Sequence, residues 1–164
     1  MTNKLSKENN IQKIIASSVA KASTIAALPI PIVDVVGVVY IQMQLIEKIA
    51  KAHNIVINDK QGVLISTLIS TVITKLLLEV MNALSHRIGI SKLFGEAMIK
   101  ASLVGISTAA IGELYDLHFK NGGDATDVGI DAIMNYLQLQ VASEKLSLQN
   151  VSSNLMDGVL QNVS

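Results

Sequence analysis

The histidines are the side chains in this sequence best suited to acid–base or metal chemistry, because imidazole titrates near neutral pH and binds metals well. His53, His86 and His118 each fall near the C-terminal end of an expected helix, where the helix dipole favours a protonated ring. They lack the close pair spacing of a metal-ligand turn. Asp116 and His118 point about 200° apart around a helix, so they do not form an acid–base pair. We predict no catalytic residue and no metal site.

A group of carboxylates offers a second kind of chemistry. Asp124, Asp127 and Asp131 have the spacing of one helical face and could imitate a calcium cluster, but the glycine and the terminal glutamate of an EF-hand loop are missing. Helix capping and a solvated face explain them better. The sequence also lacks the phosphate-loop and dinucleotide-binding glycine patterns, and it has no cysteine. We therefore expect no cofactor, and a chain that is not itself an enzyme.

Composition and charge narrow the classes of partner. Half of the residues are hydrophobic and the mean hydropathy is +0.47, which is more apolar surface than an ordinary domain of this size carries. We expect a membrane or neighbouring copies of the chain to cover part of it. A net charge of zero argues against nucleic acid as a partner. Residues 1–100 contain eleven basic and six acidic residues, and residues 101–164 contain two basic and seven acidic residues. This asymmetry fits head-to-tail self-association or attraction to anionic lipid, or merely reflects solvated faces.

Helical periodicity dominates the elements that would position these side chains. It predicts helices over residues 6–27, 31–53, 59–87 and 92–120, and a fifth that starts at Asp124 or Thr126. Asn58 is expected to cap the third helix. The fold class is all-α, with five or six helices in a compact, mostly antiparallel bundle. Residues 1–143 form the helical domain, and residues 144–164 form a short C-terminal amphipathic helix or tail.

Both prolines lie in one short run, at Pro29 and Pro31. A proline interrupts a helix that reaches it from the N-terminal side, but it suits the first turn of a new helix. The run therefore predicts a Pro-x-Pro hinge between the first two helices. Asp34 then lies near the positive end of the second helix. We interpret Asp34 as a helix-start acid, with membrane insertion or partner contact as the alternative.

Uncharged stretches bear on membrane spanning. The runs 22–33, 35–46, 61–74 and 101–112 hold 12, 12, 14 and 12 residues. Each is shorter than the roughly 18 to 20 residues that cross a hydrocarbon core, and suits buried or interfacial helices. The polar N-terminus shows no secretory signal. We expect insertion at a membrane surface rather than full spanning, with the chain at the cytoplasmic face of the membrane or in the cytoplasm.

Two expected helices carry rows of small residues at four-residue spacing. Such rows let helix backbones approach closely. The pattern fits packing of the two helices against each other inside one bundle, or contacts with other copies or within a membrane. The rows consist of Gly62, Ser66, Ser70 and Thr74 in the third helix, and Ala97, Ala101, Gly105 and Ala109 in the fourth, which Gly112 extends.

The proline run and the fourth helix also carry a family resemblance. Residues 26–34 (AALPIPIVD) with 40–50 (YIQMQLIEKIA), and residues 107–115 (STAAIGELY) with the following HF and NGG, resemble the bacterial family of domains of unknown function numbered 697, typified by YcjF-like inner-membrane proteins. The resemblance covers about residues 14–143. It implies a helical module, often membrane-associated and fused to or encoded near Era-like GTPase domains, without enzymatic activity of its own. This chain lacks a GTPase domain, and the usual Pro-Gly-rich junction is reduced to residues 86–91.

We therefore expect a non-enzymatic, membrane-associated helical accessory or scaffold module that works with a separate Era-like GTPase. The alternative is a soluble homo-oligomeric assembly or shell component, in which the small-residue rows make subunit contacts. A second alternative is a membrane-disrupting effector that uses the same amphipathic helices.

Overall fold

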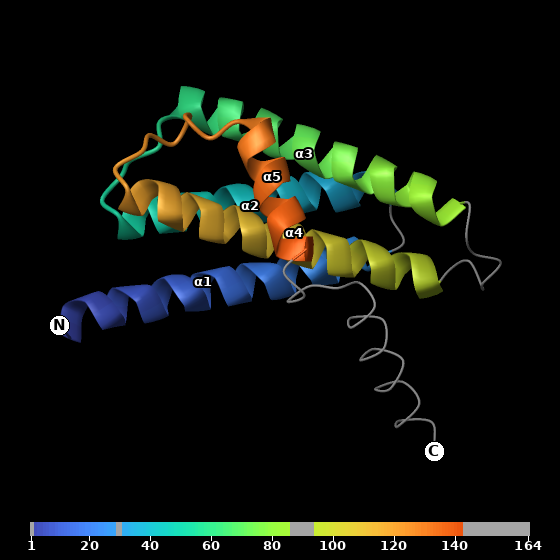
Figure 1. The fold of residues 1–164 in the computed structure, drawn as a ribbon, viewed down its shortest axis with the longest axis horizontal. Coiled ribbons are helices and arrows are strands. Elements are labelled where there is room, and N and C mark those ends of the chain that lie inside the picture. Colours follow the sequence, from blue (N-terminus) through green and yellow to red (C-terminus); the bar gives the residue numbers. More distant parts are fainter. Residues whose placement is uncertain (1, 29–30, 86–93, 143–164) are drawn as a thin grey trace, which may run out of the picture.

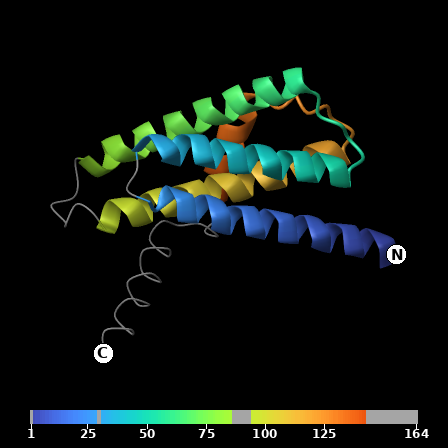
Figure 2. The ribbon, with the colours of Figure 1, turned by 180° about the vertical axis from the view of Figure 1, so that it is seen from behind.

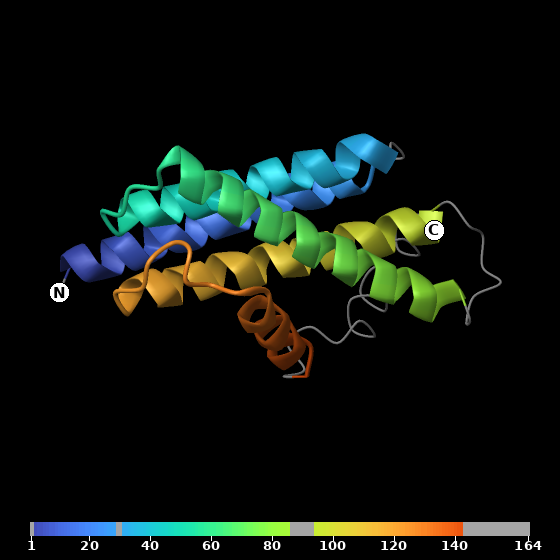
Figure 3. The same cartoon turned by 90° about the horizontal axis from the view of Figure 1, so that it is seen from above.

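A computed structural model describes residues 2–28, 31–85 and 94–142 of the chain. They form five α-helices: α1 (Thr2–Ala26), α2 (Pro31–Ala52), α3 (Asp59–Ser85), α4 (Phe94–Lys120) and α5 (Ile130–Ala142). The four long helices run alternately up and down, with α3 on one side of the bundle, α1 on the other, and α2 and α4 between them (Figure 1; seen from behind in Figure 2). The shorter α5 packs on α4 and α3, as the view from above shows (Figure 3). The predicted all-α, mostly antiparallel bundle is confirmed.

Local signals in the sequence explain why the helices end where they do. After α2, Asn54 takes a left-handed conformation with φ of 61°, and its amide and that of Ile55 donate to the carbonyls of Lys51 and Ala50. This is the Schellman arrangement, which pairs carbonyls that the helix leaves free. Asn58 then caps α3 as expected, because its Oδ1 accepts from the amide of Gln61 at 3.0 Å while Gln61 Oε1 accepts from the amide of Asn58 at 3.0 Å.

The end of α4 uses the same device with glycine. Gly122 has φ of +83°, and its amide and that of Gly123 donate to the carbonyls of Phe119 and His118. A left-handed residue at this position favours glycine because a side chain there is strained. The predicted end of the fourth helix at Lys120 is therefore confirmed.

The predicted start of the fifth helix is wrong by several residues. Asp124 Oδ1 accepts hydrogen bonds from the amide and the hydroxyl of Thr126, and the carboxylate of Asp127 accepts from the amide of Asp124. These carboxylates hold an irregular turn and cap no helix. Helical bonding begins only where the amide of Ile133 reaches the carbonyl of Gly129. The tail predicted over 144–164 lies outside the described residues.

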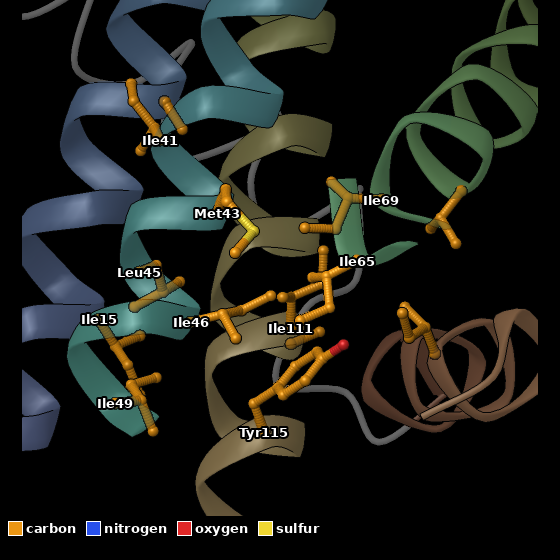
Figure 4. Packing of buried hydrophobic residues seen from close by; sticks show 14 of the residues in the cluster. Ile15, Ile41, Met43, Leu45, Ile46, Ile49, Ile65, Ile69, Ile111 and Tyr115 are labelled. Atoms are coloured by element: carbon orange, nitrogen blue, oxygen red, sulfur yellow. The ribbon is translucent and has the colours of Figure 1, made fainter. Parts of the chain in front are cut away.

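The core is aliphatic, and α4 lies at its centre. Every residue from Leu103 to Gly112 except Ala109 is buried, so this helix is covered on nearly all sides. Figure 4 shows isoleucine and leucine side chains from α1, α2, α3 and α4 meeting around Ile111 and Tyr115. By length and composition, one helix among the described residues, at Ala97–Lys120, could cross a membrane, and 44% of its most apolar stretch is buried within the bundle.

Candidate functional site

The small residues of α4 lie at the closest helix contact in the bundle. A Cβ added to Gly112 would stand 2.9 Å from Ile15 Cγ1 on α1 and 3.2 Å from Leu45 Cδ2 on α2. A Cβ on Gly105 would stand 2.6 Å from Ser23 Oγ. A side chain at position 112 would press on core carbons and separate α4 from α1. At position 105 the nearest atom is the hydroxyl oxygen of Ser23, which can rotate away. Ala101 and Ala109 are half-buried on the same helix.

The small residues of α3 face a different neighbour. A Cβ on Gly62 would lie 3.7 Å from Met43 Cε of α2, which is ordinary contact. Ser66 and Ser70 are half-buried, and the hydroxyl of Ser66 donates to the carbonyl of Gly62 at 2.8 Å. The two rows do not meet: α4 packs mainly against α1, and α3 packs mainly against α2. The small residues of α4 lie at a close approach to α1, whereas Gly62 of α3 makes only an ordinary contact with α2.

The proline run is only partly visible. Pro31 is the first residue of α2, as predicted, whereas Pro29 lies outside the described residues. Asp34 lies in the first turns of α2, and its side chain is not among those described. The predicted hinge therefore stays a prediction.

A chain of polar side chains joins three helices at one end of the bundle. His53, just after α2, has its Nε2 2.7 Å from Asp116 Oδ1 on α4, and its Nδ1 lies 3.3 Å from Lys7 Nζ on α1. Because a carboxylate only accepts, Nε2 carries the proton, and Nδ1 is left to accept from the lysine. The side chains of His53 and Asp116 are 8% and 23% exposed, and Phe119 packs against the imidazole with ring centroids 6.1 Å apart.

Sequence reasoning missed this pair. The two residues are 63 positions apart, and each looks like an isolated polar group near a helix end. The same reasoning correctly separated Asp116 from His118, whose Nε2 donates to the carbonyl of Asp124 at 2.8 Å. These contacts connect α1, α2 and α4 at this end of the bundle.

A second polar group lies deep between α2 and α4. Gln42 is fully buried, and its Nε2 donates to Thr108 Oγ1 at 2.8 Å and to Ser107 Oγ at 3.4 Å. Both hydroxyls in turn donate to the carbonyl of Val104. Gln42 Oε1 has no partner, so the amide is only half satisfied. Buried polar contacts of this kind fix the register of facing helices more than they add stability.

Within the part of the chain that the structure describes, Tyr115 is the other residue with a buried polar atom that lacks a partner. Its side chain lies beside Ile111 and near Ile65 in the core (Figure 4), and its hydroxyl makes no hydrogen bond. Burial raises the pKa of the Tyr115 phenol to about 12, because the charged form would be stranded among aliphatic groups. Tyr115 therefore acts as a large hydrophobic side chain.

The aspartates after α4 bind backbone rather than forming a metal cluster. The pKa of Asp124 is lowered, first by the backbone amide of Thr126 and then by the hydroxyl of the same residue. Within the described part of the chain, no group of three His, Cys, Asp or Glu residues is placed to hold a metal ion. The carboxylates at this turn serve local structure.

Comparison with known proteins gives two matches. A family model described as "Domain of unknown function (DUF697)" matches residues 2–157. "Magnetosome membrane protein 22" of Magnetospirillum gryphiswaldense is 26% identical over 141 residues, a region that covers 84% of this chain and 70% of that protein. No solved structure matches the chain.

Proposed function

Because the chain belongs to the DUF697 family of domains of unknown function, we propose that it is a membrane-associated helical accessory module that acts by binding rather than by catalysis. The observation that carries this proposal is the similarity, along most of the chain, to a protein named for the magnetosome membrane. A bundle with a fully formed core can still attach to a membrane through its outer side chains.

The distribution of apolar side chains supports attachment at a surface. Several large aliphatic residues remain more than half exposed after the core has formed, and they lie on helices rather than on loops alone: Leu5, Val36, Val63, Leu64, Leu78 and Leu139. The candidate membrane span among the described residues, in α4, is partly covered by its neighbours, with 44% of its most apolar stretch buried. We propose that the folded bundle lies on the bilayer and keeps α4 in its core.

The non-catalytic part of the proposal is supported by the contacts of the best-placed polar groups. His53, Asp116 and Lys7 are engaged with one another across three helices. Tyr115 and Gln42 are enclosed in the core, where no substrate reaches them. These groups stabilise or orient helices.

Vesicle sedimentation tests the proposal directly. Purified full-length protein is mixed with vesicles of phosphatidylcholine containing phosphatidylglycerol, and the pelleted fraction is measured at low and high salt and after detergent. We expect the protein to pellet with vesicles and to be released by detergent. Protein that stays in the supernatant at every lipid concentration would refute the proposal. Light scattering without lipid then identifies the alternative, since a homo-oligomeric shell component would give a mass several times 17.5 kDa.

We extend the proposal to a separate Era-like GTPase as the partner of the module, since the family resembled by residues 26–50 and 107–123 is often fused to or encoded near such domains. An adjacent GTPase gene identifies the candidate. Co-purification of the two expressed proteins, with GTP or GDP present, tests it. A candidate GTPase that elutes apart from this chain in both nucleotide states would refute the pairing.

A further inference from the structure

The outward side of α3 carries exposed aliphatic side chains together with two lysines. At about 100° per residue, Lys60, Val63, Leu64, Lys75 and Leu78 fall within about 60° of one line along the helix. We call this stripe, with the threonines between, the outer α3 face. Val63 is 67% exposed, and Leu64 and Leu78 are each 60% exposed. α3 forms one side of the bundle, away from α1 (Figures 1 and 2), and Lys60, Thr67, Thr71 and Lys75 on this face are also exposed.

The polar groups on the outer α3 face need little water. The hydroxyl of Thr67 donates to the carbonyl of Val63 at 2.9 Å, and the hydroxyl of Thr71 donates to the carbonyl of Thr67 at 2.8 Å. Both side chains are exposed, yet their donors are satisfied within the helix. Thr67 and Thr71 therefore keep an internal partner if the face leaves water, and the cost of dehydrating these two side chains is low.

Charge on the outer α3 face is positive and comes from Lys60 at its start and from Lys75, which lies just before Leu78. Lys60 and Lys75 are exposed, and the 14 residues between them carry no charge. With a rise of about 1.5 Å per residue, the two ammonium-bearing positions are about 22 Å apart along the axis. Asp59 lies to the side, and Asp124 is turned toward Gln61 on the flank that faces the loop before α5. On an anionic bilayer, the two lysines would contact the headgroups while the apolar side chains beside them enter the outer edge of the acyl chains.

The middle of α1, on the opposite side of the bundle, lacks these properties. Between Gln12 and Thr24, the exposed positions of α1 hold only polar or small side chains, such as Ser17 and Lys21. We propose that the outer α3 face is the surface by which the protein lies on an anionic lipid bilayer, with α3 parallel to the membrane plane and α1 turned toward water. This inference rests on the proposed membrane association and names the surface responsible for it.

The absence of cysteine makes a site-by-site test possible. Single cysteines are introduced as Thr67→Cys and Thr71→Cys on the outer α3 face and as Ser17→Cys on α1. Each is labelled with a fluorophore that brightens and shifts to the blue on leaving water. With vesicles of phosphatidylcholine and phosphatidylglycerol, we expect this change for both α3 labels and no change for the label at position 17.

The outcomes separate the inference from the proposed function. If the labelled proteins pellet with vesicles while the α3 labels stay in water, or if position 17 shifts instead, the assignment to α3 is wrong and membrane association stands. If no labelled protein pellets, membrane association itself fails. If the α3 labels shift without vesicles as protein concentration rises, a second copy of the chain occupies the face, and the lipid assignment is overturned.

The lysines give an independent measurement. Each lysine at an anionic surface is expected to strengthen partitioning about fivefold, so Lys60→Gln with Lys75→Gln should weaken binding to phosphatidylglycerol-containing vesicles by about 25-fold. The matched control, Lys13→Gln with Lys21→Gln on α1, removes two exposed lysines as well and should change partitioning by less than about threefold. Equal losses in the two double variants would show that net charge, not the outer α3 face, directs binding.

Discussion

Replacement of Tyr115 by phenylalanine tests how the centre of the bundle is packed. Tyr115 is fully buried and its hydroxyl has no hydrogen-bond partner. A buried donor left unpaired costs about 1–3 kcal/mol of stability, and phenylalanine fills the same space without that group. We therefore expect Tyr115→Phe to raise the free energy of unfolding by about 1 kcal/mol, measured by urea denaturation at neutral pH and followed by circular dichroism.

The same substitution should change how steeply the free energy of unfolding falls at alkaline pH. The phenol ionises near its ordinary pKa of 10.0 in the unfolded chain and near about 12 in the folded one. Between these values the unfolded state binds fewer protons, so the stability that is fully present below the unfolded pKa falls as pH rises. Two pKa units correspond to a loss of about 2–3 kcal/mol. Tyr115→Phe should abolish this part of the loss.

Tyr136→Phe is the matched control, because the Tyr136 hydroxyl donates to Glu113 Oε2 at 3.0 Å. Removing that hydrogen bond should lower stability by about 0.5–1.5 kcal/mol, opposite in sign to the core substitution. If Tyr115→Phe instead destabilised the protein by more than about 1 kcal/mol, the hydroxyl would have a partner and the reasoning would be wrong. If the variant kept the wild-type alkaline slope, ionisation of Tyr115 would not be the source of that slope.

Three further predictions concern helix contacts and the turn before α5. Gly112→Ala should lower the free energy of unfolding by about 1–3 kcal/mol, because its new Cβ meets packed core side chains. Gly105→Ala should have a free energy of unfolding within about 1 kcal/mol of wild type, because the nearest atom is a serine hydroxyl that can rotate. Urea denaturation compares the two variants, and equal effects would contradict the α1–α4 geometry. Asp116→Ala should lower the free energy of unfolding by about 1–3 kcal/mol, because it leaves the proton on His53 Nε2 unpaired. Asp116→Asn should lower it less, since asparagine keeps an acceptor. A double-mutant cycle that shows no coupling between His53 and Asp116 would count against the pair. The lowered pKa of Asp124 gives stability that is present above its ordinary pKa of 3.8 and is lost as pH falls through the folded pKa. Asp124→Asn should therefore flatten the fall in melting temperature below pH 3.8. If the melting temperature fell with acid as steeply as in wild type, the turn would gain nothing from the charge.

Local signals explain how much of the fold could be predicted from sequence. Asn58 and Gly122 act on backbone groups within a few residues, so the ends of α3 and α4 that they set were predictable. The start of α5 was not, because a carboxylate followed by threonine can cap a helix or close a turn, and Asp124 closes a turn.

Partners across the bundle could not be predicted in the same way. The small-residue row of α4 indicates a close approach, but its neighbour is α1 because α4 fills the space between α1 and α2. Similarly, His53 meets Asp116 only once α2 and α4 have packed. Spacing along one helix defines a face, and the packing of all the helices together decides what that face contacts.

The central place of α4 has a consequence for synthesis on the ribosome. α1 packs more extensively against α4 than against α2, its neighbour in the chain, and Ile15 meets Gly112 only after the chain has been translated beyond α3 and into α4. Until then, α1, α2 and α3 have no partner for the apolar sides that later enclose α4. The nascent chain must be protected from aggregation during this interval, and the last long helix completes the core in a late, non-local step.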